Sequence, residues 1–162
     1  MPKLTDDIYI NFRRLKSQDV EDLSSALLQS SVDYIRYFHP FDFDTSSIRC
    51  VLNNANKDKF FAIELISIAT KLFSGFYMLR GFDEGYIDPM YGVFIAQPYT
   101  GQGIARLSLA HAECYCKIHK HKRLLLKVHP NNFRAKSLYE SFGFQFMRED
   151  LISQNLVLYK DL

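Results

Sequence analysis

The sequence predicts a mixed α/β fold, in which helices flank a sheet with both antiparallel and parallel strands. Short segments of continuous or alternating apolar residues, typical of strands, recur between segments with apolar residues at helical spacing. The chain has 162 residues, of which 48% are hydrophobic and 23% charged, close to ordinary globular usage. Since no repeat, linker or shift in composition divides it, we expect one domain over residues 1–162.

The N-terminal half is predicted to begin with a strand, continue through helices and end in a hairpin. Ser17 can cap one helix, and Asp44 or Thr45 can cap another. The first of these helices has apolar residues at amphipathic spacing, namely Val20, Leu23, Leu27 and Leu28. The elements expected are a strand at 8–15, helices after Ser17, over 31–38 and over 46–54, and antiparallel strands at 60–67 and 72–81.

The C-terminal half is predicted to alternate strands and helices. The elements expected are strands at 90–96 and 124–128, helices at 102–119 and 132–142, and closing strands at 142–147 and 156–160. The apolar faces expected for the two helices consist of Ile104, Leu107, His111, Cys114 and Ile118, and of Ala135, Leu138, Tyr139 and Phe142.

What the sequence lacks excludes several classes of protein. No stretch approaches the roughly 18 apolar residues of a membrane span, and the first residues lack the apolar run of a signal peptide. Three cysteines, Cys50, Cys114 and Cys116, are too few for a disulfide scaffold, so we expect a cytoplasmic protein. Because residues two apart on a helix point to different faces, Cys114 and Cys116 predict no metal site.

The charge is unevenly distributed, although the net charge of the chain is only +2. Between residues 97 and 136 there are eight basic residues and one acidic residue, Glu113, which gives this segment +7 and leaves −5 elsewhere. Such a segment favours an anionic ligand, and a solvated basic helix face is the alternative interpretation. Its densest part, residues 117–123, is too short and too poor in aromatic residues to indicate nucleic acid.

A glycine-rich turn follows the apolar strand at 90–96. Gly101-Gln102-Gly103 comes immediately before a helix, and glycines allow a tight turn and close approach of a ligand. The free N–H groups at a helix start favour phosphate. A dinucleotide fingerprint would need glycine where Arg106 stands, and no P-loop lysine is present. A phosphate-binding turn and an ordinary tight turn therefore both remain open.

A second pattern lies between residues 128 and 144. After a strand that ends at His129-Pro130, Asn132 can cap a helix that carries Tyr139 two turns later, and Gly143 can end that helix. Each residue has an ordinary structural explanation. The two patterns in this order and at this spacing are much more specific than either alone.

Together, the two patterns resemble the GNAT superfamily of acyl-CoA-dependent N-acyltransferases. The pyrophosphate motif of that family falls on residues 100–105, with Thr100 where Gln or Arg is usual. The strand at 74–81 resembles the third strand of the family, and the order of elements agrees over residues 8–160. The second motif, Asn-x-x-Ala-x-x-Leu-Tyr-x-x-x-Gly-Phe, matches Asn132, Ala135, Leu138, Tyr139, Gly143 and Phe144 without a gap.

The resemblance implies a mostly antiparallel sheet with a splayed central pair of strands. It also implies acetyl-CoA or another short acyl-CoA as co-substrate, with no metal. The pantetheine arm would pair with the splayed strand over 93–96, which includes Phe94 and Ile95. The pyrophosphate would contact the turn at Thr100 and the N–H groups of Gly101, Gln102, Gly103, Ile104 and Ala105.

The resemblance further implies direct attack of an amine on the thioester carbonyl, with the oxyanion held by a backbone N–H near Ile95. Tyr139 would protonate the departing thiolate. Asn132 would contact the pantetheine arm or order its own helix. The base that deprotonates the amine is left open: a water chain would need no single base, and the candidates in order are Asp88, Glu84, His129 and His39.

The acceptor is expected to be a primary amine of a small molecule. Candidate contacts are His39, Phe41 and Phe43, although the two phenylalanines have an alternative role as core side chains. The pattern is similar to family members that acylate amino sugars on nucleotides, while a protein or peptide amine, a polyamine and an aminoglycoside stay open. A non-catalytic acyl-CoA-binding module is the alternative function. We expect acyl-CoA and the amine as partners of a monomer or homodimer, without nucleic acid or membrane.

Overall fold

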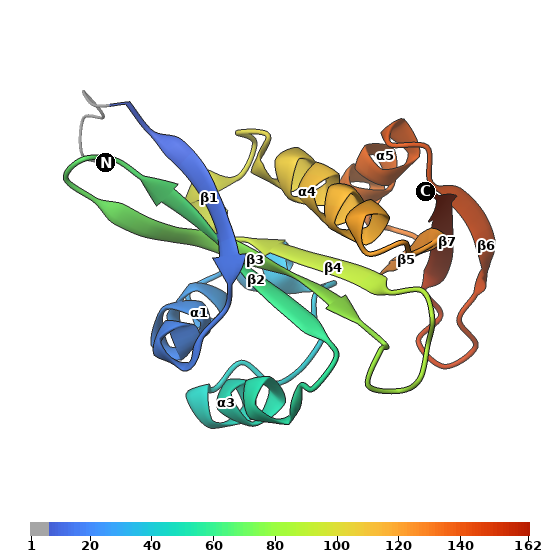
Figure 1. Ribbon diagram of the computed structural model, residues 1–162, viewed down its shortest axis with the longest axis horizontal. Helices are drawn as coiled ribbons and strands as arrows, with labels where there is room; N and C mark the ends of the chain where they lie inside the picture. Colours follow the sequence, from blue (N-terminus) through green and yellow to red (C-terminus); the bar gives the residue numbers. More distant parts are fainter. Residues whose placement is uncertain (1–6) are drawn as a thin grey trace.

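The computed structural model describes residues 7–162, which form one seven-stranded sheet (Figure 1). The strands are β1 (Tyr9–Arg14), β2 (Lys59–Ile66), β3 (Lys71–Arg80), β4 (Met90–Ile95), β5 (Arg123–Val128), β6 (Gln145–Glu149) and β7 (Leu156–Asp161). Their order in the sheet is β1-β2-β3-β4-β5-β7-β6, and every neighbouring pair is antiparallel except β4 and β5. The predicted mixed, mostly antiparallel sheet is confirmed.

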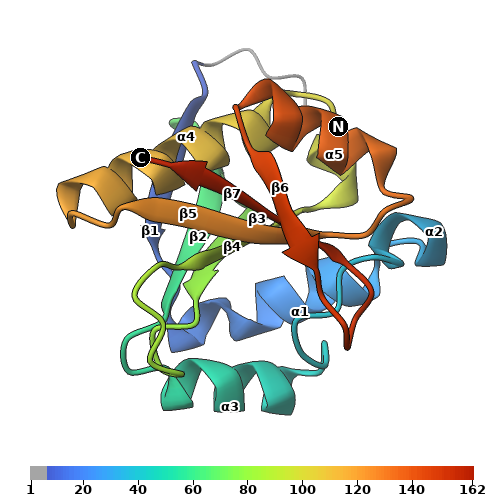
Figure 2. The same cartoon turned by 90° about the vertical axis from the view of Figure 1, so that its right-hand side faces the viewer.

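Helices cover both faces of this sheet. They are α1 (Val20–Leu28), α2 (Val32–Ile35), α3 (Thr45–Asn54), α4 (Ile104–Ile118) and α5 (Phe133–Ser141), with short 3-10 turns η1 (Ser17–Asp19) and η2 (Gln97–Tyr99). Helices α1 and α3 lie on one face, and α4 and α5 on the other (Figures 1 and 2). Alternate residues of β3 enter the two resulting cores, Phe76 on the α1 side and Tyr77 on the α4 side. No helix within residues 7–162 is long and apolar enough to cross a membrane.

Several element boundaries differ from the prediction, and the helix expected over 31–38 is reduced to α2; glycines in left-handed backbone explain two of the differences. Helix α4 begins at Ile104 rather than at residue 102, because Gly101 and Gly103 have φ angles of 79° and 83°. Strand β6 begins at residue 145 rather than at residue 142, because Gly143, with φ of 86°, follows the end of α5. Backbone at positive φ interrupts a regular helix or strand, and glycine adopts it without steric cost.

The apolar face predicted for α4 is wrong in part, since Ile104 is buried and His111 stacks on Phe12 as a packed face requires. Leu107 and Ile118 are 49% and 70% exposed, and Cys114 is also exposed. The face against the sheet consists of Ile104, Ser108, Leu109, Ala112 and Cys116. The buried Ser108 hydroxyl is satisfied, because it lies 2.8 Å from the Tyr91 hydroxyl. Small residues allow close packing of helix on sheet, and a search for large apolar side chains overlooks them.

The parallel pair of strands separates soon after it forms. Strands β4 and β5 pair only at Met90–Leu125 and Tyr91–Leu126. Strand β3, in contrast, stays paired with β4 as far as Ile95. The C-terminal half of β4 therefore has a partner on one side and a gap on the other, as a splayed pair requires.

The hydrogen-bond pattern shows which backbone groups face this gap. The N–H of Ala96 donates to the Ser74 carbonyl of β3 at 2.8 Å. In an antiparallel strand, the N–H and C=O of one residue face the same neighbouring strand, and residues two apart face the same side. Phe94, two residues before Ala96, therefore also directs its backbone groups toward β3. Val93 and Ile95 consequently direct their N–H and C=O groups away from β3, toward the gap.

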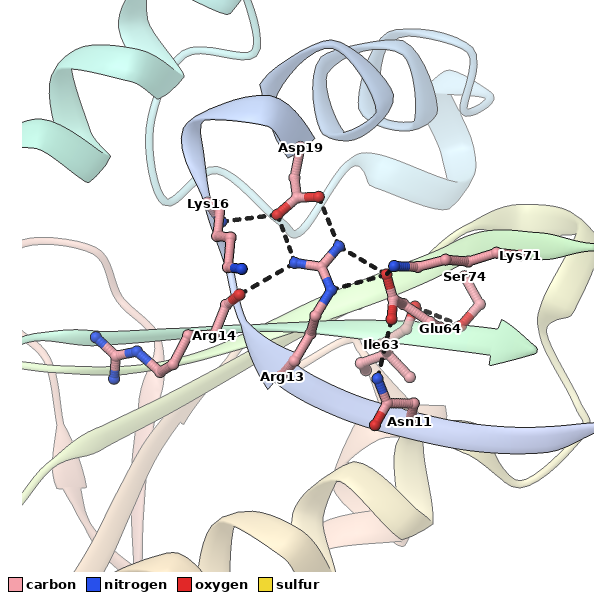
Figure 3. A network of polar contacts seen from close by, with 9 residues as sticks. All are labelled: Asn11, Arg13, Arg14, Lys16, Asp19, Ile63, Glu64, Lys71 and Ser74. Carbon is pink, nitrogen blue, oxygen red and sulfur yellow. Dashed lines mark hydrogen bonds and ion pairs between the residues drawn. The ribbon is translucent and has the colours of Figure 1, made fainter.

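An ion-pair network joins β1 and β2 to the turn η1 (Figure 3). Arg13 donates to Asp19 at 2.7 and 2.8 Å and to Glu64 at 2.6 and 2.9 Å. Asn11 and Lys71 also contact Glu64. Burial by itself would raise the pKa of both carboxyls, but the hydrogen bonds, chiefly from Arg13, outweigh burial and hold both pKa values below the ordinary range. Because both carboxylates are buried and paired, we interpret the network as structural.

We expect Glu64→Gln to lower the free energy of unfolding at pH 7 by about 1–3 kcal/mol, because a charged partner of Arg13 is lost. The folded-state pKa of Glu64 lies below its unfolded-state value of about 4. Its contribution is therefore present above about pH 4 and is lost as the pH falls through the folded-state pKa. Denaturant unfolding of both proteins between pH 7 and about pH 2 measures this. The difference should shrink on acidification, and a constant difference would contradict the assignment.

Candidate active site

A groove of about 960 Å³ begins at the gap between β4 and β5. One part is lined by the turn before α4 and by α5, and the other by α2, the start of β4 and the β6–β7 loop. Gln102, Phe41 and Phe43 are not in its wall. The predicted site residues that line it are His39, Asp88, Phe94, Ile95, Thr100, Gly101, Gly103, Ile104, Ala105, His129, Asn132 and Tyr139. The groove thus brings together residues that are far apart in the sequence.

The turn before α4 leaves room for an anion. A side chain built on Gly103 would meet no atom within 4 Å, so the N-terminus of α4 is open at this point. Arg134 of α5 approaches the same turn, because its Nη2 lies 3.9 Å from where a Cβ of Gly101 would be. The Thr100 hydroxyl donates to the Gln97 carbonyl at 2.9 Å and so stabilises the turn itself. Free N–H groups, a helix dipole and a guanidinium together favour a phosphate group.

The exposed edge of β4 can bind an extended chain. Val93 and Ile95 line the groove and direct backbone groups into the gap, where an added strand would form the hydrogen bonds that β5 does not. Tyr34 of α2 donates from its hydroxyl to the Ile95 carbonyl, which fixes that end of the edge. Phe94 differs from its predicted role, since its backbone faces β3 and its side chain, 3% exposed, packs with Phe38.

Tyr139 presents a phenol to the groove from a largely buried position. The residue is 7% exposed, and its ring packs edge-on against Tyr91 at 6.5 Å. Burial raises the pKa of Tyr139 to about 12. The hydroxyl is therefore protonated at neutral pH and is available as a hydrogen-bond donor.

Asn132 is the N-cap of α5. Its side-chain oxygen accepts a hydrogen bond from the Ala135 N–H at 3.3 Å, so it orders the helix that carries Tyr139. This agrees with one of the two roles expected for Asn132. Its amide nitrogen is not used by the cap.

His129 stacks on Tyr37, with ring centroids 4.4 Å apart. Its Nδ1 lies 3.1 Å from the N–H of Asn131 and must accept that hydrogen bond. The neutral imidazole then carries its proton on Nε2 and has no free lone pair for a proton from an amine. This geometry favours His129 as a donor or positioning group rather than as the general base.

Asp88 and Glu84 lie before β4, at the end away from the gap. Asp88 is four residues before Gly92, which corresponds to about 13 Å of extended chain. Its Oδ1 is buried without a hydrogen-bond partner among residues 7–162. Burial raises the pKa of the Cys116 thiol to about 12, and the nearby negative charge of Asp88 contributes to the same shift. Both carboxylates come before the part of β4 that faces the gap, and their roles as bases stay predictions.

Phe41 and Phe43 lie outside the wall of the groove. Both are packed against the core beneath α1 and α3, where Phe41 contacts Phe76 at 6.1 Å between ring centroids. Both side chains are partly buried in this cluster, and their roles as substrate contacts stay predictions. His39 does line the groove, and its ring stacks on Phe43.

Some groove residues are absent from the expected set. Arg134 follows the cap residue of α5 by two positions, and its place in the basic segment was a usable signal. The Tyr34 contact with the Ile95 carbonyl joins residues 61 positions apart, so the sequence contains no signal for it. Within residues 7–162, no group of three His, Cys, Asp or Glu side chains is arranged to hold a metal ion.

Comparisons with known proteins agree on one family. The acetyltransferase (GNAT) family matches residues 25–144. A spermine/spermidine N(1)-acetyltransferase of Bacillus subtilis is 36% identical over 70 residues, which are 43% of this chain and 46% of that protein. A 5-NmdU N-acetyltransferase of Pseudomonas phage PaMx11 is 29% identical over 87 residues, which are 54% of this chain and 60% of that protein. The matches thus span about half of these relatives.

The fold comparison extends over nearly the whole chain. The crystal structure of a spermidine N-acetyltransferase from Vibrio cholerae, in complex with CoA and spermine, superposes with a TM-score of 0.77. The match covers 94% of this chain and 95% of that one at 19% sequence identity. At this identity the likeness establishes a common fold.

Proposed function

The chain belongs to the acetyltransferase (GNAT) family, and on that premise we propose that it transfers an acetyl or other short acyl group from CoA to a primary amine. The observation that carries the proposal is the continuous groove that joins the open turn before α4, the free edge of β4 and the hydroxyl of Tyr139. These three features suit the pyrophosphate, the pantetheine arm and the thioester of one acyl-CoA molecule. The proposed setting is the cytoplasm.

The proposed binding mode follows the groove. The pyrophosphate binds the N–H groups of residues 101–105, assisted by Arg134. The pantetheine amides pair with the backbone groups of Val93 and Ile95 that face the gap, where the Ile95 carbonyl also accepts the hydrogen bond from Tyr34. The thioester then lies near the point where β4 and β5 separate, beside Tyr139.

The proposed reaction is a direct transfer. The amine nitrogen attacks the thioester carbonyl and forms the new C–N bond, and an N–H of Val93 or Ile95 stabilises the oxyanion. The C–S bond then breaks, the new amide nitrogen gives up its extra proton, and the thiolate takes up a proton, both through water in the groove. An ordinary thiol has a pKa of about 8.5. With a pKa of about 12, Tyr139 is the weaker acid, so we propose that it donates a hydrogen bond to the developing thiolate.

The amine must lose a proton before it attacks. The carboxylates of Glu84 and Asp88 come before the part of β4 that faces the gap, and His129 has its Nδ1 engaged. We therefore favour deprotonation through water in the groove over a single protein base. The acceptor is proposed to be a small-molecule amine, with an amino sugar on a nucleotide as one class that fits.

A paired measurement tests this function. Calorimetry measures binding of acetyl-CoA, and thiol release measures amine-dependent turnover across a broad amine panel. We expect binding together with turnover of at least one amine. Binding without turnover of any amine would instead support a non-catalytic acyl-CoA-binding module, and no binding would overturn both functions.

We expect Thr100→Arg to leave acetyl-CoA affinity equal or up to about tenfold higher. The threonine hydroxyl bonds only within its own turn, whereas arginine can reach a phosphate with charge-assisted hydrogen bonds. Titration of both proteins with acetyl-CoA measures the change. A loss of about tenfold or more would show that Thr100 itself contacts the cofactor.

A further inference from the structure

The part of the groove that would receive the amine has cations on two opposite walls. Along β3, Arg80 is two residues beyond Met78, which pairs with Gly92 at the level of the gap. On the other side, Lys127 of β5 and Arg148 of β6 both pair with Val157 of β7. They therefore lie in one row across the sheet, about 10 Å apart at the backbone, on the same face. The floor between the walls is apolar and includes Met78, Met90 and Leu125.

Lys127 and Arg148 differ in their polar interactions. Lys127 forms an ion pair with Asp150, a buried carboxylate that also accepts the Ile152 N–H. Arg148 is exposed and forms no ion pair within residues 7–162, and its one hydrogen bond is to the Glu149 carbonyl at 3.5 Å. An arginine with this freedom, beside a lysine, is suited to bidentate binding of a carboxylate or phosphate.

The loop next to Arg148 is ordered. The Asp150 N–H donates to the Asn155 carbonyl, and the Gln154 N–H donates to the Asp150 carbonyl, both at 2.8 Å. Ser153 and Asn155 of this loop also line the groove. The wall therefore combines a free guanidinium with polar side chains on a fixed turn.

Arg80 on the opposite wall is held but incompletely satisfied. It donates from Nη1 to the Pro40 carbonyl at 3.2 Å, and its Nε lies 3.6 Å from Asp58. That buried Nε has no hydrogen-bond partner among residues 7–162. Three acidic residues line the groove. Asp33 is on α2, whereas Glu84 and Asp88 come after Arg80 and before Met90 in the chain, beyond Arg80 as seen from the gap.

We infer that the acceptor is an amine that also carries an anionic group, a carboxylate or a phosphate, which Arg148 binds beside Lys127. This inference rests on the proposed acyltransferase function and specifies its substrate class. With the amine at the gap, the acceptor meets Arg80 along β3 before it reaches Glu84 and Asp88, and it meets Lys127 and the exposed Arg148 on the opposite wall. An anionic group is attracted there, whereas a second ammonium group, as in a polyamine, is repelled.

Matched acceptors test the inference by steady-state kinetics at saturating acetyl-CoA. Glucosamine 6-phosphate is compared with glucosamine, 4-aminobutyrate with 4-aminobutyramide, and spermidine serves as the polycation. We expect kcat/KM to be about tenfold or more higher for the anionic member of at least one pair, with spermidine the poorest acceptor. The pair that responds distinguishes phosphate from carboxylate.

Arg148→Gln is expected to lower the anionic-to-neutral ratio of kcat/KM about tenfold. Arg49→Gln is the matched control, because Arg49 is an exposed arginine of α3 outside the groove, and it should leave the ratio unchanged. Equal kcat/KM within both pairs, a preference for spermidine, or a ratio that survives Arg148→Gln would overturn the inference while the acyltransferase function stands. Failure of every amine to be acetylated would overturn the function, and the inference with it.

Discussion

Gly103→Asp is expected to weaken acetyl-CoA binding by about 100-fold or more, while the fold is retained. The new carboxylate would enter the open space at the N-terminus of α4, where the pyrophosphate is proposed to bind. Two like charges about 4 Å apart repel by about 1–4 kcal/mol between water and a protein surface. The position has φ of 83°, so any side chain adds backbone strain of about 1–2 kcal/mol.

Gly103→Asn separates the charge from the strain. Asparagine has nearly the same shape as aspartate, tolerates the left-handed region and carries no charge. Calorimetric titration with acetyl-CoA should therefore give the highest affinity for the wild type, a lower affinity for Gly103→Asn and the lowest for Gly103→Asp. Thermal unfolding of each variant shows whether the fold is retained. Unchanged affinity of Gly103→Asp would remove the pyrophosphate from this turn.

Tyr139→Phe is expected to lower kcat by about 10²–10³-fold with little change in KM for acetyl-CoA. Removal of one hydrogen-bond donor to a developing anion has effects of this size in other enzymes. The donor acts when charge develops on sulfur, so ground-state binding should be nearly unaffected. The phenyl ring preserves the packing against Tyr91 and Phe144, so thermal stability should change little.

Tyr115→Phe is the matched control for this substitution. Tyr115 is on α4, packs against Phe61 and does not line the groove. The kcat of the Tyr115→Phe variant should therefore match that of the wild type. A second signature comes from pH. Because the pKa of Tyr139 is about 12, its ionisation should cause no loss of kcat between pH 7 and about pH 10. Near wild-type turnover of Tyr139→Phe would remove its hydroxyl from the mechanism.

Much of the fold follows from local sequence signals. The order of strands and helices was predictable because the elements have their own apolar periods and three helices, α2, α3 and α5, have a capping side chain. Asp44, for example, accepts from the Ser47 N–H at 2.8 Å and begins α3 as expected. Ser17 does not cap α1 as predicted, because it lies within η1. The side of a helix that packs on the sheet was less predictable. Leu28 is 64% exposed, although its spacing fits the apolar stripe of α1.

The candidate site likewise has parts that local sequence predicts and parts that depend on tertiary structure. Residues 100–105 and 132–144 lie in two continuous segments, and a pattern along the chain is enough to find them. The position of Phe41 against the core depends on tertiary packing and could not be predicted, since an apolar ring suits a core and a binding site equally. The row that contains Lys127 and Arg148 depends on β7 lying between β5 and β6, which no local pattern encodes.

The central claim is that acetyl-CoA binds along the gap between β4 and β5. Backbone amide resonances recorded during titration with acetyl-CoA test it most directly, because they report each N–H separately. We expect the largest shifts at Val93, Ile95, Gly101 and Gly103, with little change in β1 and β2. Saturable shifts confined to another surface, or no shifts at a concentration that supports turnover, would contradict the claim.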